Sequence, residues 1–265
     1  MKLNKQIALI LSVVTAAVCG SVIASFAGRN QHQPKGVEAA NNALKGRAAK
    51  QLDDEMTPTV EYEAGSSDAV KTSPSRQLKN SKHDNARWVA KDLDERVSEV
   101  VSEPEWAAGL SDLPVDKSDL VVEGEVIDAN AFLSTDRTGV YSEFSVQVAE
   151  VLRKSTGEAI NLNDTVVVER TGGKVRYKSG KSVRYRIEGQ GSPIRGQRYL
   201  FFLRKVDQLT YQLLTAYQIQ GDKVFALDGS RINERGQGDW VFDKHNDENL
   251  NDFRQKVQEA ITKLH

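Results

Sequence analysis

Beyond residue 118, apolar and polar side chains alternate with a period of two, and this alternation constrains the fold more than any other feature of the chain. Val122 and Val126 alternate with acidic residues, and Phe144, Val146 and Val148 lie two positions apart. Side chains with this period point to opposite faces of a strand, so the pattern predicts strands with one buried face. A helix could not gather the same residues on one side.

More short strands follow, and turn residues separate them. The expected strands cover 164–168, 174–177, 181–187, 199–203, 211–219 and 223–227. Lys178-Ser179-Gly180 and Gly221-Asp222 supply hairpin turns. The 199–203 strand is apolar on both faces, which predicts that it is the most enclosed. Since almost no helical pattern interrupts the series, we expect a mainly β fold, an antiparallel barrel or sandwich.

Two apolar stripes with helical spacing flank these strands. The first stripe predicts an amphipathic helix over 85–102, with Asp84 or Asn85 as N-cap, inside a helical and irregular docking segment that covers 86–118. Its members are Trp88, Val89, Leu93, Val97, Val100 and Val101. The second stripe predicts a C-terminal helix over 246–264 that packs on an open side of the sheet. Its members are Leu250, Phe253, Val257, Ile261 and Leu264, with Asp247 or Asn249 as N-cap.

The N-terminal part of the chain has the pattern of an export signal followed by a tether. Lys2 and Lys5 precede an uncharged, apolar stretch over 7–27, as in segments that the export machinery recognises. Signal peptidase could cut after Ala27, the stretch could stay as a membrane anchor, or Cys19 could carry a lipid. Each outcome places the remainder outside the cytoplasm, in the periplasm, at the cell surface or secreted.

Residues 28–85 are expected to be a disordered tether, because they contain one tyrosine and neither tryptophan nor phenylalanine. The β domain with its C-terminal helix then occupies 119–265. The lone Cys19 lies in the export segment, so the folded part cannot contain a disulfide framework, a thiolate zinc site or a cysteine nucleophile. A net charge of −1 excludes a histone-like polyanion binder.

Two stretches carry a resemblance to a known family. The first runs from Asp119 through Val126 to Val140-Tyr141 and Phe144-x-Val146-x-Val148, and the second is Gly196-x-x-Tyr199-Leu200-x-Phe202-Leu203. Together they resemble exported bacterial OB-like β domains and, more distantly, netrin/TIMP-like modules, over roughly 119–227. The resemblance implies a fold and carries no chemistry. The chain lacks the N-terminal cysteine pair of the netrin-like protease inhibitors, so inhibition by that route is not implied.

No residue pattern assigns a catalytic, metal or cofactor site. The run Asp243-x-His245-x-Asp247-Glu248 could supply hard metal ligands, yet acids are equally typical of a solvated helix start. Gly189-x-Gly191 lacks the Lys-Ser/Thr of a phosphate loop and is interpreted as a loop flexible enough to form a binding edge.

One charge anomaly stands out between residues 170 and 205, where eleven Lys and Arg residues accompany one acid, Glu188. Alternation places four of these cations on one face of the 174–187 hairpin: Lys174, Arg176, Arg184 and Arg186. Because like charges on neighbouring strands repel, something must offset them. Acids of the same chain, such as Glu169 or those of 243–248, could do so. The alternative is an anionic partner, either an envelope component or an acidic protein surface.

The expected function is therefore that of a non-catalytic extracytoplasmic β module, which binds a partner or serves as envelope structure. Lys174, Arg176, Arg184 and Arg186 are its candidate anion-binding residues. Nucleic acid is not expected, because the chain has the pattern of an exported protein and lacks an aromatic and basic stacking motif. The alternative is an extracytoplasmic hydrolase or accessory domain with an unrecognised site.

Overall fold

The computed structural model describes residues 56–63, 73–91, 96–102, 106–208, 210–229 and 241–264. All of them belong to one compact unit of the chain that begins at Arg47. The predicted export signal over 1–27 lies outside the described residues. Within the described part, no helix combines the length and the apolar character needed to cross a membrane.

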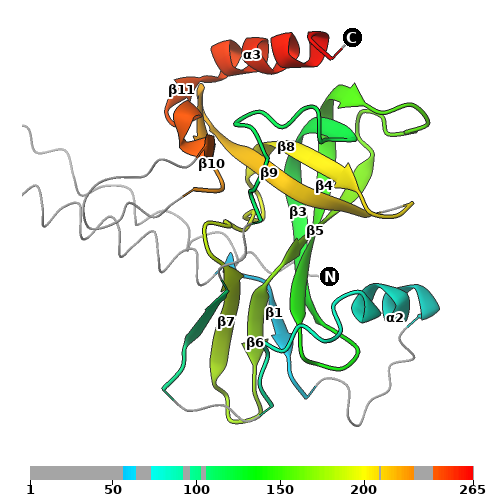
Figure 1. Cartoon of the computed structure of the whole chain (residues 1–265), viewed down its shortest axis with the longest axis vertical. Helices are drawn as coiled ribbons and strands as arrows, with labels where there is room; N and C mark the ends of the chain where they lie inside the picture. Colours follow the sequence, from blue (N-terminus) through cyan, green and yellow to red (C-terminus); the bar gives the residue numbers. More distant parts are fainter. Residues whose placement is uncertain are drawn as a thin grey trace, which may run out of the picture. The chain divides into compact units, whose positions relative to one another are not determined.

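Five long strands of the main sheet pair in a ring (Figure 1). They are β3 (Leu120–Leu133), β4 (Val140–Lys154), β5 (Thr165–Thr171), β8 (Arg198–Lys205) and β9 (Thr210–Gln220). The ring runs β3-β4-β5-β9-β8 and returns to β3. Only the β5–β9 pairing is parallel among these neighbours. The short strands β10 (Lys223–Ala226) and β11 (Glu248–Asn249) extend the sheet beside β9.

The alternating side chains fill the interior of this ring, as the sequence predicts. Val122, Phe144, Val146 and Val168 are completely buried in one cluster, with further members from β8 and β9. On β8 every residue from Tyr199 to Leu203 is at most 1% exposed, because the strand is covered on both faces. The antiparallel, mainly β architecture is therefore confirmed.

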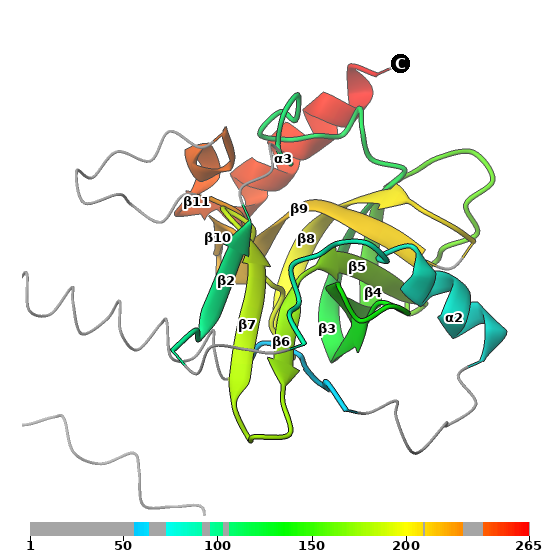
Figure 2. The same cartoon turned by 60° about the horizontal axis from the view of Figure 1, so that its bottom comes forward.

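A second, mixed sheet has the strand order β1-β6-β7-β2 (Figure 2). Its strands are β1 (Thr59–Glu61), β6 (Gly173–Arg176), β7 (Ser182–Ile187) and β2 (Glu99–Ser102). The predicted β6–β7 hairpin forms the centre, and β1 and β2 add to its two edges in parallel. Its apolar face packs against the far ends of β3 and β4, where Ala131 and Val140 join Val175 and Tyr185 in a separate buried cluster.

The helix predicted over 85–102 is not observed, so that prediction is wrong. Asn85 and Arg87 have φ values of 63° and 59°, a left-handed conformation that interrupts a helix where it was expected to begin. Glu99–Ser102 instead forms β2, hydrogen-bonded to β7. The valines at helical spacing are also β-branched residues that suit an edge strand, and Leu93 lies outside the described residues.

The stretch expected to be a disordered tether also differs from expectation where it is described. Thr59–Glu61 is β1, and Pro74–Ser81 is an α-helix, α2. Tyr62 is 8% exposed and stacks on Tyr177, so a single aromatic residue anchors this segment to the mixed sheet. Pairing with a distant strand supplies the stability that composition alone did not indicate.

The C-terminal helix is confirmed as α3 (Leu250–Thr262), with Asn249 as its N-cap. Phe253, Val257 and Ile261 are buried in a cluster that also contains the outward side chains of β3, β8 and β9, such as Val121. The helix thus covers the outer face of the main sheet, opposite the ring interior.

Candidate functional site

The four predicted cations lie on one face of the β6–β7 hairpin. Lys174 is directly opposite Arg184 in the strand register, and Arg176 and Arg186 lie two positions away on β6 and β7. The other face carries Val175, Val183 and Tyr185 and is buried. The alternation of the two strands therefore brings the cations together, as the sequence indicated.

Acids from the flanking strands contact this basic face, which we define as Lys174, Arg176, Arg184 and Arg186. Arg176 pairs with Glu61 of β1 at 3.0 Å, and Arg186 pairs with Glu99 of β2 at 2.8 Å and with Glu188 at 3.0 Å. Burial alone would lower the pKa of Arg186, but its hydrogen bonds to Glu99 and Glu188 outweigh burial and raise it. Part of the expected repulsion is thus offset within the chain.

The acids suggested by the sequence are not the ones that contact the basic face. Glu169 instead contacts His83 at 3.0 Å, and the acids of 243–248 lie with the C-terminal elements. Glu61 and Glu99 were missed because they sit in segments read as a tether and a helix. Their role as partners of the cations follows only from the pairing of β1 and β2 with the hairpin.

The basic face leads into a pocket of about 280 Å³ at the end of β7. Arg184 and Arg186 belong to the basic face and also line the pocket. Other lining residues include Glu188, which pairs with Arg186, and also Gln190, Tyr199, Gln218 and Leu227. The oxygen Gln190 Oε1 is buried, and no described residue offers it a hydrogen bond. The pocket therefore combines two arginines, one acid and apolar walls, a mixture common in sites for small polar ligands.

The loop that borders the pocket, residues 188–192, is held in place along its length. Trp106 Nε1 donates a hydrogen bond to the Glu188 carbonyl at 2.8 Å, and the amide of Gly229 donates to the Gly189 carbonyl at 3.1 Å. The amide of Gly191 donates to Asp228 Oδ1 at 2.9 Å. These bonds indicate a fixed edge in place of the flexible loop that the glycines predicted.

A buried ion pair lies behind the same loop. Arg170 is 4% exposed and Asp228 is fully buried; the guanidinium donates to both carboxylate oxygens, at 2.6 and 2.9 Å. Arg170 Nη1 also donates to the Gly191 carbonyl at 2.5 Å. The bidentate pair joins the end of β5 to the segments on both sides of the pocket.

The residues considered as metal ligands do not converge on one point. His245 is buried, with Nδ1 2.7 Å from Glu248 and Nε2 3.1 Å from Asp112, whereas Asp247 pairs with Lys223 at 2.6 Å. Hydrogen bonds from Lys244 and His245 outweigh burial and lower the pKa of Asp112. Over the described ranges, no three His, Cys, Asp or Glu residues are arranged to hold a metal ion.

Comparisons with known proteins do not place the chain in a family. No model of a known family matches the sequence, and a search of curated proteins found no match either. Function must therefore be argued from the site itself.

Proposed function

We propose that this protein is a non-catalytic, extracytoplasmic binding module whose ring of five strands is an OB-like barrel. In chain order, β3, β4, β5, β8 and β9 are the first to fifth strands of the ring. Around the ring they follow the order first, second, third, fifth, fourth, and the fourth strand pairs with the first. A closed ring of five strands in this order, with one parallel pairing between the third and fifth strands, supports a five-stranded barrel of the OB type. Export is supported by Lys2 and Lys5 before the uncharged stretch 7–27.

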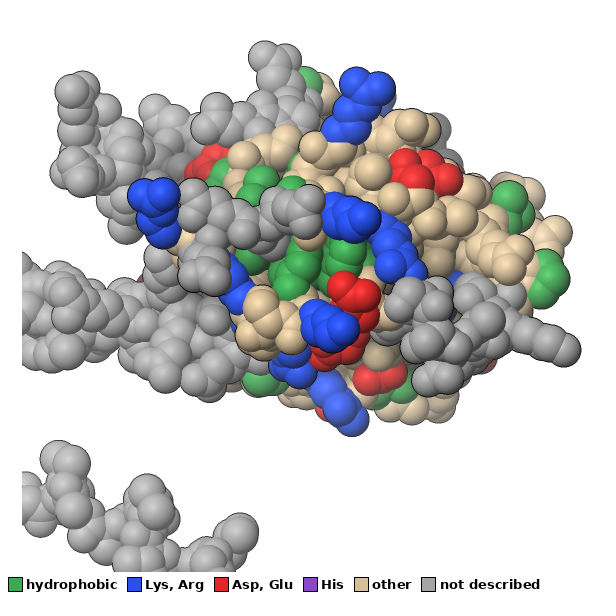
Figure 3. Space-filling model, turned by 90° about the horizontal axis from the view of Figure 1, so that it is seen from below, with side chains coloured by type: hydrophobic (Ala, Val, Ile, Leu, Met, Phe, Trp, Pro, Cys, Tyr) green, Lys and Arg blue, Asp and Glu red, His purple; other side chains and the backbone are tan. Residues whose placement is uncertain are grey.

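The ligand that we propose is an anionic component of the cell envelope, bound by the basic face and the adjoining pocket. One observation carries this proposal: Arg184 and Arg186 belong to the row of cations and also line a pocket whose rim is held by hydrogen bonds. Seen from below, Lys and Arg side chains surround hydrophobic and acidic ones on the side where β6 and β7 lie (Figure 3). Such a mixed surface suits a ligand with anionic groups on an uncharged frame.

Charge reversal on the exposed part of the basic face tests this function. Arg184 is only 7% exposed, so an acid there would disturb folding, whereas the side chain of Arg176 is 52% exposed. We therefore choose Lys174→Glu with Arg176→Glu and measure retention on immobilised heparin and on anionic lipid vesicles. The variant is expected to elute at clearly lower salt than the unmodified protein, since it loses two of the four cations of the basic face.

The matched control is Lys154→Glu with Lys263→Glu, which changes the net charge by the same amount at exposed positions of β4 and the end of α3. This control should elute close to the unmodified protein. Equal elution of the two double variants would show that retention follows net charge alone and would contradict the proposal. A change on vesicles but not on heparin would identify lipid head groups as the anion.

A further inference from the structure

Helix α2 lies on the sheet with its polar side inward. Arg76, Lys79 and Asn80 of α2 and His83 of the following turn are half-buried, at the spacing of one helix face, and the helix buries no residue completely. Leu78 points outward and is 67% exposed. This is the reverse of an ordinary surface helix, in which the apolar side faces the core. The helix is therefore held by charge and hydrogen bonding.

The surface beneath α2 is the outer face of β4 and β5, and it carries two buried acids. Glu143 and Glu169 are directly opposite each other in the strand register, and each is 8% exposed. Like charges in this arrangement destabilise a sheet. Tyr141 and Phe132 lie beside them. An acidic and aromatic surface of this kind has the composition that binds cations.

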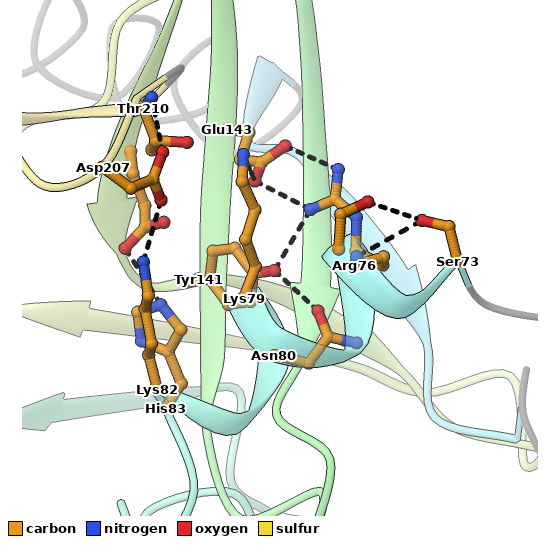
Figure 4. A network of polar contacts seen from close by, with 12 residues as sticks. Ser73, Arg76, Lys79, Asn80, Lys82, His83, Tyr141, Glu143, Asp207 and Thr210 are labelled. Carbon is orange, nitrogen blue, oxygen red and sulfur yellow. Dashed lines mark hydrogen bonds and ion pairs between the residues drawn. The ribbon is translucent and has the colours of Figure 1, made fainter.

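The side chains of α2 and the following turn satisfy this surface in detail (Figure 4). Arg76 donates to both oxygens of Glu143 at 2.7 and 2.8 Å, and Lys79 donates to the same carboxylate at 3.1 Å. The Arg76 guanidinium lies 3.8 Å from the centre of the Phe132 ring. His83 stacks on Tyr141 with the ring centres 4.0 Å apart. Each contact recognises a cationic or planar group.

Glu143 stays ionised, and Glu169 keeps spare bonding capacity. Burial raises the pKa of Glu143, but the hydrogen bonds from Arg76 and Lys79 outweigh it, so the pKa lies below its usual value. Glu169 Oε1 contacts His83, whereas Glu169 Oε2 is buried with no hydrogen-bond partner in the described part of the chain. The surface can therefore accept one more donor than α2 supplies.

We propose that this surface, defined as Phe132, Tyr141, Glu143 and Glu169, binds a basic segment of a partner protein and that α2 is its internal occupant. Because α2 buries no apolar residue, its release forfeits little hydrophobic stabilisation, and salt screens the ion pairs that hold it. A partner segment with an arginine followed three residues later by a lysine reproduces the observed contacts. A further donor on that segment reaches Glu169 Oε2 and favours the partner over α2.

A peptide-binding assay tests the proposal without knowledge of the partner. The probe is a fluorescein-labelled peptide with the sequence of residues 73–85 of this chain, and the measurement is fluorescence anisotropy at low ionic strength. Arg76→Gln with Lys79→Gln removes the internal competitor and leaves the acids intact. This variant is expected to bind the probe about tenfold tighter than the unmodified protein, whose own helix acts as a tethered competitor.

Two controls fix the interpretation. Lys154→Gln with Lys263→Gln removes the same charge elsewhere and should bind like the unmodified protein. Adding Glu143→Gln and Glu169→Gln to the Arg76 and Lys79 variant should abolish binding. The proposal is overturned if the Arg76 and Lys79 variant binds no tighter than the charge control, or if binding survives the loss of both acids.

Hydrogen exchange on the unmodified protein keeps the test decisive if a variant fails to fold. Raising sodium chloride from about 50 to about 500 mM should accelerate exchange of the α2 amides, such as that of Gln77, while β4 amides keep their protection. Equal protection of α2 at both salt concentrations would contradict an electrostatically held, displaceable helix.

Discussion

At the scale of single residues, the Arg170–Asp228 pair links the ring to the pocket. The two residues lie 58 positions apart in the chain, and both are buried. Asp228 also accepts the Gly191 amide, so one carboxylate holds a strand end and a loop together. Nothing in the local pattern around either residue reveals the partner, because Arg170 belongs to the basic run and Asp228 follows an ordinary short strand.

Asp228→Ala is expected to lower the free energy of unfolding by about 3–5 kcal/mol, because it leaves the Arg170 guanidinium buried without its counter-ion. Arg170→Met with Asp228→Leu should cost clearly less, since no buried charge remains. Urea unfolding monitored by circular dichroism measures both changes. A loss below about 1 kcal/mol for Asp228→Ala would show that the pair is not buried in solution.

At the scale of elements, the passage from β5 into β6 moves the chain from the main sheet to the mixed sheet. Gly172 has a φ of +109°, and a Cβ added there would lie 2.7 Å from the Tyr185 carbonyl oxygen. Both the conformation and the close approach require glycine. This bend lets the β6–β7 hairpin leave the ring and pair with β1 and β2 in the mixed sheet.

Gly172→Ala is expected to lower the free energy of unfolding by roughly 2–3 kcal/mol, through backbone strain and a clash with β7. Gly180→Ala is the matched control, because Gly180 also has a positive φ, +83°, but nothing lies within 4 Å of an added Cβ. It should cost only about 1 kcal/mol. Thermal and urea unfolding compare the two, and equal losses would mean that β7 does not approach Gly172 as described.

The elements that sequence could predict are those whose pattern is local. Alternation located the strands from β3 to β10, and the helical stripe with Asn249 as cap located α3. The strands β1 and β2 were not predicted, because parallel pairing with a distant hairpin produces no recognisable pattern in a segment of three or four residues. Helix α2 did have a signal: Ser73 caps it and Pro74 opens it, a typical helix start. Its polar composition concealed that signal.

At the scale of the whole described unit, two buried clusters share the long strands β3 and β4. The first half of β3 and the middle of β4 line the ring interior, whereas the end of β3 and the start of β4 support the mixed sheet. Sequence alternation could place Lys174, Arg176, Arg184 and Arg186 on one face, since it depends only on strand period. It could not predict Glu61, Glu99 or the pocket, because these arise where segments distant in the chain meet.

Nuclear magnetic resonance tests most directly whether the basic face and its pocket bind an anionic ligand. The folded protein is titrated with a short heparin-derived oligosaccharide. Amide shifts are expected to concentrate in β6, β7 and residues 188–192, and Lys174→Glu with Arg176→Glu should weaken them. Shifts that spare these segments, or that gather on another face of the molecule, would contradict anion binding at the basic face.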